Sequence, residues 1–265
     1  MRVLVIRPSH DARRWAQSLA ARGLDAVALP LMDIAPVRDA AAVPRLSDYR
    51  AVMFVSANAG SHFPGALVPF ASRAWAPGPG TRDALLHAGV DATLIDAPAD
   101  DAAQFDSESL WQRVGAQVRP GDRVLVVRGR DPQGRNAGRD WLASQIEGAG
   151  GVVEFVAVYQ RCVPRLDAAQ LALARQAASD GSVWLFSSSE AVANLRGLLP
   201  DLSWQHARAL ATHPRIAQAA REAGFAVVCE SRPALADVVA AIDPFEWAPP
   251  SPTLPPYLLL PSPKR

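Results

Sequence analysis

The sequence predicts an α/β protein of two doubly wound, parallel-sheet domains that arose by internal duplication. The first observation behind this prediction is that three early segments are echoed later in the chain. The pairs are residues 2–7 with 123–128, 51–56 with 182–187, and 80–89 with 214–224. A repeat period this long indicates duplicated domains, because solenoid repeats run roughly 20–50 residues. We expect the functional site in the cleft between the two domains.

The second observation is a set of short apolar runs, each bounded by polar residues. Such runs predict strands buried on both faces, which are typical of parallel sheets. Helical spacing of apolar residues follows two of the runs, over 12–22 and 140–147. Strands that alternate with helices predict doubly wound sheets. The apolar runs are Val3–Ile6, Val52–Val55, Val124–Val127 and Val183–Phe186.

Glycines and prolines mark the limits of these elements. Residues 30–37 and 156–164 occupy the same place in the two repeats and are rich in β-forming residues, so we expect extended connectors. Prolines crowd the chain after Asp243, and we expect residues 244–265 to form a flexible, partly polyproline tail. Four glycines are expected to cap helix C-termini, namely Gly23, Gly89, Gly148 and Gly224.

Composition excludes several classes of function. The 265 residues carry 27 basic and 26 acidic side chains, so the net charge of +1 gives no field that favours nucleic acid or an anionic membrane. The only cysteines, Cys162 and Cys229, form no zinc-spaced cluster with histidine. No stretch approaches the roughly 20 apolar residues of a membrane span, and no secretion signal opens the chain. We expect a soluble, reduced, cytoplasmic protein.

Polar residues follow the predicted strands at the edge where open α/β sheets bind ligands. Ser56, Ala57 and Asn58 follow one strand, and Ser187 and Ser188 follow its echo. Their hydroxyls and the N–H groups of the helices behind them suit an anionic ligand. The alternative for either Ser56 or Ser187 is a helix N-cap. The sequence shows no phosphate-binding Walker loop, nucleophile elbow or His-Glu-x-x-His motif.

Arginines are the second group of candidate ligand-binding residues. Arg7 and Arg128 end the first strand of each repeat, and Arg128 with Gly129 opens a loop rich in glycine and arginine that runs to Arg139. The guanidinium fork suits carboxylates. We expect Arg7, Arg128, Gly129 and Arg139 to bind the ligand, whereas the other arginines of the loop fit a solvated surface better.

The remaining candidates lie at later helices and in the second connector. Thr81 and the pair His213-Pro214 are expected to begin the two echoed helices, with Pro214 at the first helical position. Tyr159 lies in the second connector, where a tyrosine facing the cleft can donate a proton. The alternative for Tyr159 is a half-buried aromatic residue on a β ladder.

Taken in order, these segments resemble the uroporphyrinogen-III synthase family over roughly residues 1–243. The resemblance rests on ordered short segments rather than on one motif. The segments are Val5-Ile6-Arg7-Pro8, Pro30-Leu31, Phe54-Val55-Ser56-Ala57-Asn58-Ala59, Gly80-Thr81, Val127-Arg128-Gly129, Gly138-Arg139 with Trp141-Leu142, Val158-Tyr159-Gln160-Arg161 and Phe186-Ser187-Ser188.

The resemblance implies two flavodoxin-like domains joined by a two-stranded β ladder. It places residues 1–34 and 165–243 in one domain and residues 38–156 in the other. The connectors 30–37 and 156–164 would then cross between the domains as the ladder.

The resemblance also implies a monomeric enzyme of tetrapyrrole and heme biosynthesis that needs no cofactor or metal. Its substrate would be the linear polycarboxylate hydroxymethylbilane, closed to a macrocycle with loss of water and inversion of the last pyrrole ring. Tyr159 matches the family's tyrosine considered for the departure of the hydroxyl. Ser56, Thr81, Ser187 and Arg128 match positions that line the cleft. A non-catalytic two-domain binding or sensor protein is the alternative function.

Overall fold

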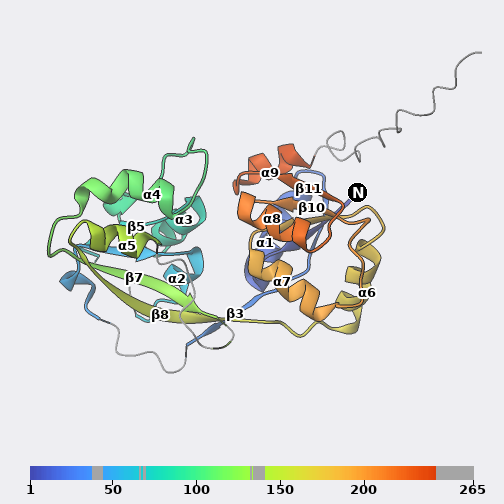
Figure 1. Ribbon diagram of the computed structural model, residues 1–265, viewed down its shortest axis with the longest axis horizontal. Helices are drawn as coiled ribbons and strands as arrows, with labels where there is room; N and C mark the ends of the chain where they lie inside the picture. The colour runs from blue at the N-terminus through green and yellow to red at the C-terminus, as the bar shows by residue number, and fades with distance from the viewer. Residues whose placement is uncertain (38–43, 66, 68–69, 132, 134–140, 243–265) are drawn as a thin grey trace, which may run out of the picture.

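The structure is a computed structural model that describes residues 1–37, 44–65, 67, 70–131, 133 and 141–242. Two lobes lie side by side, each built of strands and helices, and β3 lies at the junction between them with the end of β8 (Figure 1). Among the helices of the described residues, none is long and apolar enough to cross a membrane. The predicted tail, residues 244–265, and the candidate Arg139 lie outside the described residues.

The first lobe contains a five-stranded sheet in the order β11-β10-β9-β1-β2, and all its strand pairs are parallel. Helices cover both faces, with α1 and α9 on one and α6, α7 and α8 on the other. The strands are β1 (Arg2–Ile6), β2 (Asp25–Ala28), β9 (Val183–Phe186), β10 (Arg208–Ala211) and β11 (Val227–Glu230). The helices are α1 (Ser9–Ala20), α6 (Ala168–Ala177), α7 (Ser189–Leu198), α8 (Pro214–Glu222) and α9 (Leu235–Ala241).

The apolar run of β1 explains why both faces of this sheet are covered. Val3 and Val5 pack into one apolar cluster and Leu4 and Ile6 into the other, and all four side chains are fully buried. Alternate residues of a strand point to opposite faces, so a continuous apolar run needs a core on each side. The prediction of strands buried on both faces is confirmed here.

The second lobe contains a six-stranded sheet in the order β3-β8-β7-β4-β5-β6. Its pairs are parallel except for β3 with β8. Helices α2 and α3 pack on one face, and α4 and α5 on the other. The strands are β3 (Asp33–Pro36), β4 (Ala51–Phe54), β5 (Arg73–Trp75), β6 (Ile95–Asp96), β7 (Arg123–Arg130) and β8 (Val152–Cys162). The helices are α2 (Ala57–Ser61), α3 (Pro79–His87), α4 (Ser107–Val114) and α5 (Trp141–Gly148), and short 3-10 turns are η1 (Leu46–Asp48), η2 (Ala92–Leu94) and η3 (Gly115–Gln117).

The two sheets repeat one strand order. The order β2-β1-β9-β10-β11 in the first lobe matches β8-β7-β4-β5-β6 in the second. The echoed runs in β1 and β7 occupy the second place of these two five-strand orders, and those in β9 and β4 occupy the third. Within the first lobe the order is that of flavodoxin-like sheets. The predicted α/β class with doubly wound parallel sheets is confirmed.

The second connector differs from its predicted limits, since it is part of one long strand. β8 pairs with β7 over Val152–Gln160 and then with β3, where Asp33 lies opposite Cys162 and Pro36 opposite Tyr159. The strand therefore starts four residues before the predicted connector, because its first half is the edge of the parallel sheet. The predicted antiparallel ladder between the lobes is present.

The glycine predictions are confirmed at three of four positions. Gly23, Gly89 and Gly224 have φ values of 84°, 87° and 95°. The prediction for Gly148 was wrong, because Gly148 is the last residue of α5 and Gly150 adopts the left-handed conformation instead, at φ 86°.

Candidate active site

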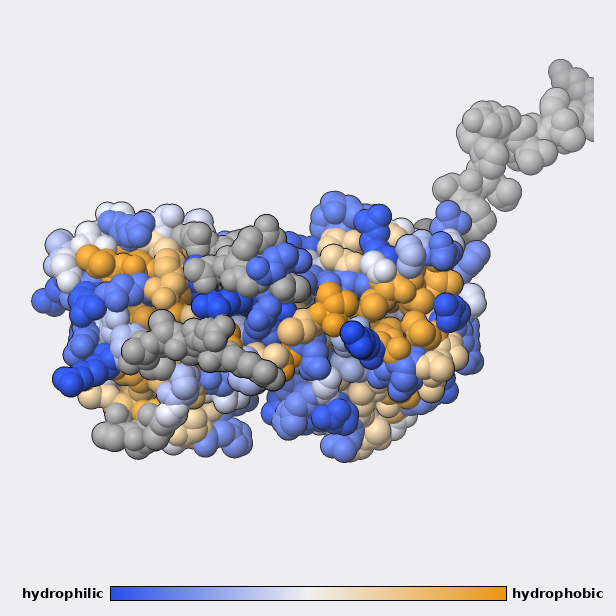
Figure 2. All heavy atoms as spheres, turned by 90° about the horizontal axis from the view of Figure 1, so that it is seen from below, coloured by the Kyte–Doolittle hydropathy of each residue, from blue (hydrophilic) through white to orange (hydrophobic). Residues whose placement is uncertain are grey.

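The candidate site lies where segments that leave the carboxyl ends of the two sheets meet. Glu190 follows β9 and lies beside Arg161, with 2.7 Å between Oε2 and Nε. His213 follows β10 and lies beside Asp106, with 3.7 Å between Nε2 and Oδ2. Ligands of open α/β sheets bind at this edge. The fold thus brings the two predicted binding edges to one interdomain junction, and the surface seen from below is indented between the lobes (Figure 2).

Tyr159 lies at the point where β8 contacts both β7 and β3. Its hydroxyl oxygen is 3.1 Å from Oγ of Ser56, and its side chain is only 4% exposed. The His62 ring packs at a centroid distance of 6.0 Å. Burial raises the pKa of Tyr159 above its ordinary value, while the hydrogen bond with Ser56 and the charge of Arg161 act in the opposite direction. The phenol therefore keeps its proton near neutral pH.

Gly129 provides the space that the Tyr159 ring occupies. The pairing of β7 with β8 shifts register between Arg128 and Gly129, and this irregularity sets Gly129 opposite Tyr159. A Cβ atom on Gly129 would lie 2.2 Å from Cε2 of the tyrosine ring. Any larger residue here would collide with the ring, so the missing side chain fixes where the phenol lies.

Ser56 has the N-cap role considered from the sequence, while its contact with a ligand stays a prediction. It is the N-cap of α2, because its Oγ accepts a hydrogen bond from the N–H of Ala59 at 3.3 Å. The same Oγ contacts Tyr159. Ala57 and Asn58 form the first turn of this short helix, and the Asn58 carbonyl faces the His62 ring at 3.1 Å.

The echoed serines are arranged differently. Ser188 is the N-cap of α7 and accepts a hydrogen bond from the N–H of Glu190 at 3.2 Å. Ser187 instead donates its hydroxyl to the Ile6 carbonyl of β1 at 3.4 Å. The N-cap alternative for Ser187 was thus wrong, because the helix begins one residue later.

The two echoed helices begin close to the predicted positions. Pro214 is the first residue of α8 and follows the N-cap His213, as predicted. Thr81 differs, because α3 begins at Pro79 with Gly78 as its N-cap, and Thr81 is a buried residue of the first turn.

Each of the two described candidate arginines stacks on an aromatic ring. The guanidinium carbon of Arg7 lies 3.9 Å from the centre of the Trp15 ring, and that of Arg128 lies 3.8 Å from the centre of the Phe155 ring. Burial is the main cause that lowers the pKa of Arg7, to about 10, so Arg7 remains charged at neutral pH. Stacking holds the plane of the fork, the arrangement in which arginine binds carboxylates by two parallel hydrogen bonds.

Contacts on another side of the junction also join the lobes. Arg232, between β11 and α9, donates to the Asp100 carbonyl at 2.5 Å, and its guanidinium lies 5.3 Å from the centre of the Phe105 ring. Burial alone would raise the pKa of Asp106, but hydrogen bonds from Ser109 and His213 bring that pKa below its usual value. Asp100, Phe105, Asp106 and Arg232 come from loops whose sequence shows no repeat or motif, whereas His213 stands at the predicted start of an echoed helix.

Two further charged residues at the site were missed although a signal existed. Arg161 lies two residues after Tyr159, and residues two apart on a strand point to the same face. Glu190 follows the serine triplet and occupies the second position of α7. Arg161 lies inside the predicted connector rather than at a predicted strand end, and Glu190 is acidic, whereas the predicted site consists of hydroxyls and arginines at strand ends.

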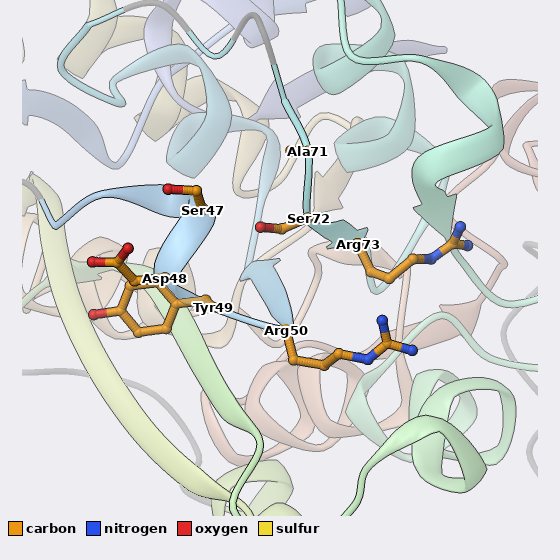
Figure 3. Close-up of a pocket in the computed structure, with 7 residues that line it drawn as sticks. All are labelled: Ser47, Asp48, Tyr49, Arg50, Ala71, Ser72 and Arg73. Atoms are coloured by element: carbon orange, nitrogen blue, oxygen red, sulfur yellow. The ribbon is translucent and has the colours of Figure 1, made fainter.

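A separate hollow lies on the opposite edge of the second lobe. Its volume is about 360 Å³, and Figure 3 shows Arg50 and Arg73 extending away from Tyr49 within it. The guanidinium of Arg73 is bound by the Asp96 carboxylate at 2.6 Å. The hollow is at the amino-terminal ends of β4 and β5, so it is not part of the candidate site. Its lining residues are Ser47, Asp48, Tyr49, Arg50, Ala71, Ser72 and Arg73.

Comparisons with known proteins agree with this architecture. A family model described as "Uroporphyrinogen-III synthase HemD" matches residues 13–240. The uroporphyrinogen-III synthases of Escherichia coli (strain K12) and Salmonella typhimurium are each 28% identical over 240 residues, which cover 85% of this chain and 92% of the relative.

Two solved structures share the fold. A mutant uroporphyrinogen III synthase from the extremely thermophilic bacterium Thermus thermophilus has a TM-score of 0.51 at 15% identity, over 93% of this chain and 97% of that one. The uroporphyrinogen-III synthetase from Helicobacter pylori 26695 has a TM-score of 0.51 at 14% identity, over 91% and 97%. Since the family model spans most of the sequence, this chain belongs to the uroporphyrinogen-III synthase family.

Proposed function

We propose that this chain closes hydroxymethylbilane to uroporphyrinogen III, with loss of water and inversion of the last pyrrole ring. We further propose that it acts in the cytoplasm. We also propose that it acts as a monomer, since the candidate site is formed by both lobes of a single chain. Membership of the family supports the reaction. The roles of individual residues are proposed from their positions at the junction.

The observation that carries the proposal is the placement of the Tyr159 hydroxyl. It is held by Ser56 at the junction, next to the ladder that links the lobes. Because burial favours the neutral phenol, Tyr159 carries a proton that it can donate to a leaving hydroxyl. Tyr159 is therefore our candidate general acid.

The chemistry requires one proton to reach the leaving group. The pyrrole nitrogen of the terminal ring pushes electrons toward the hydroxymethyl carbon, and the carbon–oxygen bond breaks. The departing oxygen takes the phenol proton and leaves as water, which gives a protonated azafulvene cation that keeps its pyrrole N–H. The cation is attacked by the substituted α-carbon of the last ring, at the other end of the chain, and a spiro intermediate forms. The old bond from that carbon to its bridging methylene then breaks, and the methylene rejoins the free α-carbon of the same ring, which inverts that ring. A proton lost from a ring carbon when the macrocycle forms restores the phenol, so the net change is loss of one water.

The substrate's acetate and propionate carboxylates need positive or N–H partners. We propose Arg7, Arg128 and Arg139 as charged partners, and the N–H groups at the starts of α7 and α8 as neutral ones. Ser188 and Pro214 stand at these two helix starts. Placing the substrate chain in a folded conformation is the main contribution that such contacts make to the rate.

The test is a coupled assay with freshly generated hydroxymethylbilane, followed by oxidation and separation of the product isomers. Closure without assistance gives the type I isomer, so a dominant type III product supports the proposal. Type I alone from folded protein would refute it and leave the junction as a binding site.

The residue assignment is tested with Tyr159→Phe, which we expect to lower turnover by about 10²-fold or more, as general acids typically contribute. Its stability should fall by only about 0.5–1.5 kcal/mol, the value of one hydrogen bond. Tyr49→Phe is the matched control, because Tyr49 donates to Glu154 away from the site. Unchanged turnover in folded Tyr159→Phe would remove Tyr159 from the mechanism.

A further inference from the structure

An ion pair beside Tyr159 joins the two lobes. Arg161 belongs to β8 of the six-stranded sheet, whereas Glu190 belongs to α7, which covers the five-stranded sheet. The 2.7 Å contact between them is partly shielded, with the side chains 22% and 26% exposed. An ion pair withdrawn from water in this way is less screened than one on an open surface.

The geometry of β8 couples this pair to the phenol. Tyr159 and Arg161 are two residues apart on one strand, so their side chains project from the same face. Tyr159 is fixed on one side by Ser56 of the second lobe, and Arg161 is fixed on the other by Glu190 of the first. The short segment between them is therefore held at both ends, by opposite lobes.

The groups that face Tyr159 come from four elements. They are Ser56 and His62 at the two ends of α2, Gly129 of β7, Arg161 of β8 and Glu190 of α7. Burial has the largest effect on the pKa of Tyr159 and raises it. The Arg161 charge lowers that pKa, and the Glu190 charge raises it. Glu190 is itself affected by burial and by Asp131, both of which raise its pKa, and by Arg161, which lowers it.

We propose that Arg161 and Glu190 are positioning residues for Tyr159, and that their ion pair holds the phenol at the interdomain junction and balances the charge beside its hydroxyl. This inference rests on the proposed role of Tyr159 as general acid. Removing either partner would leave the other charge unopposed near the phenol. A shielded charge that has lost its partner destabilises the structure around it.

The first test measures the phenol directly and does not depend on catalysis. The chain has three tyrosines, Tyr49, Tyr159 and Tyr257, so protein labelled with carbon-13 at tyrosine Cζ gives a simple spectrum that Tyr159→Phe assigns. Titration of the label reports the pKa of Tyr159. Glu190→Gln should lower it, because Arg161 is left unopposed. Arg161→Gln should raise it, because the Glu190 charge is left unopposed.

Two further variants separate charge from structure. Arg161→Lys keeps the charge and should leave the pKa of Tyr159 close to that of the unsubstituted protein. Arg221→Gln removes one partner of the Arg221–Glu230 pair, which lies between α8 and β11, and should leave the pKa of Tyr159 unchanged. Shifts of the same sign in Glu190→Gln and Arg161→Gln, or no shift in either folded variant, would overturn the proposal whatever Tyr159 does in catalysis.

Turnover tests the positioning role. We expect Glu190→Gln and Arg161→Gln each to lose turnover by about 10-fold to 100-fold, the order that misplacing a catalytic group costs. The alkaline limit of the turnover profile should move to lower pH in Glu190→Gln and to higher pH in Arg161→Gln. Opposite titration shifts with full turnover in both variants would overturn the positioning role. If Tyr159→Phe alone keeps full turnover, the proposed function of Tyr159 fails, and the positioning role fails with it.

Discussion

Replacing Gly129 with alanine is expected to displace the Tyr159 ring and so to lower both stability and turnover. The added Cβ atom would lie 2.2 Å from Cε2, 2.4 Å from Cζ and 2.7 Å from Cδ2 of that ring. Ordinary contact begins at 3.4 Å, so the shortest of these distances is 1.2 Å too small. The ring is buried and has little room to retreat, so β7 and β8 must separate or the ring must turn away from Ser56.

Separation of the strands and rotation of the ring would each lower the free energy of unfolding. Overfilling a packed site destabilises a protein by about 1–3 kcal/mol. Loss of the bond between Tyr159 and Ser56 adds about 0.5–1.5 kcal/mol. We therefore expect the free energy of unfolding to fall by about 1.5–4.5 kcal/mol. A shift of roughly 1 Å in a catalytic group can reduce turnover by about 10²-fold, which is the activity loss we expect in the fraction that folds.

The assay combines denaturant unfolding with turnover measured on the type III product. Gly197→Ala in α7 is the matched control, because a Cβ atom there meets nothing within 4 Å. That change should be neutral or slightly stabilising, since alanine is favoured over glycine in a helix by about 0.5–1 kcal/mol.

Combining Gly129→Ala with Tyr159→Phe separates packing from catalysis. Phenylalanine keeps the ring, so the stability loss should persist, whereas the turnover loss should largely disappear because the hydroxyl is already absent. Native stability and turnover in Gly129→Ala would refute the placement of the ring. An equal turnover loss in the Tyr159→Phe background would show that Gly129 acts by another route.

Two further predictions concern titration and the contacts between lobes. Burial, and then the hydrogen bond to Glu154, raise the pKa of Tyr49 to about 12, and burial raises that of Tyr159. Both groups bind protons more tightly when folded, so their contribution to stability is complete below about pH 10 and is lost as the pH rises through the folded pKa of each group, which is about 12 for Tyr49. Urea unfolding across this range should show a decline that Tyr49→Phe reduces, and an unchanged decline would contradict the assignment. Arg232→Ala removes the contacts with Asp100 and Phe105, and we expect a larger radius of gyration in small-angle X-ray scattering. The control Arg221→Ala should scatter like the unsubstituted protein, and an equal radius in Arg232→Ala would show that its contacts do not hold the lobes together.

The fold could be predicted from the sequence because its strongest signals are local. The run Val3–Ile6 and its echo Val124–Val127 need two covered faces each, and this requirement alone selects parallel sheets with helices on both sides. The extent of β8 could not be predicted, because its first half pairs with β7 while its second half pairs with β3, which is far away in the sequence.

The site was only partly predictable, for a similar reason. Ser56 and Tyr159 were both selected, but their contact joins residues 103 positions apart and depends on the register shift at Gly129. Gly129 was selected as a ligand-binding residue, whereas its contact in the structure is with the tyrosine ring. Nothing in the local sequence reports the distance between a glycine on one strand and a ring on the next.

The strand order also sets the sequence of events during synthesis. All strands of the six-stranded sheet have been made once Cys162 leaves the ribosome, whereas β1 (Arg2–Ile6) and β2 (Asp25–Ala28) must wait for β9, which begins only at Val183. The lobe that holds the amino terminus therefore finishes folding last. Nascent chains that have exposed residues only as far as Cys162 should protect β4 and β7 from protease while β1 stays cleavable. Early protection of β1 would show that the first β-α-β unit is stable before its neighbours exist.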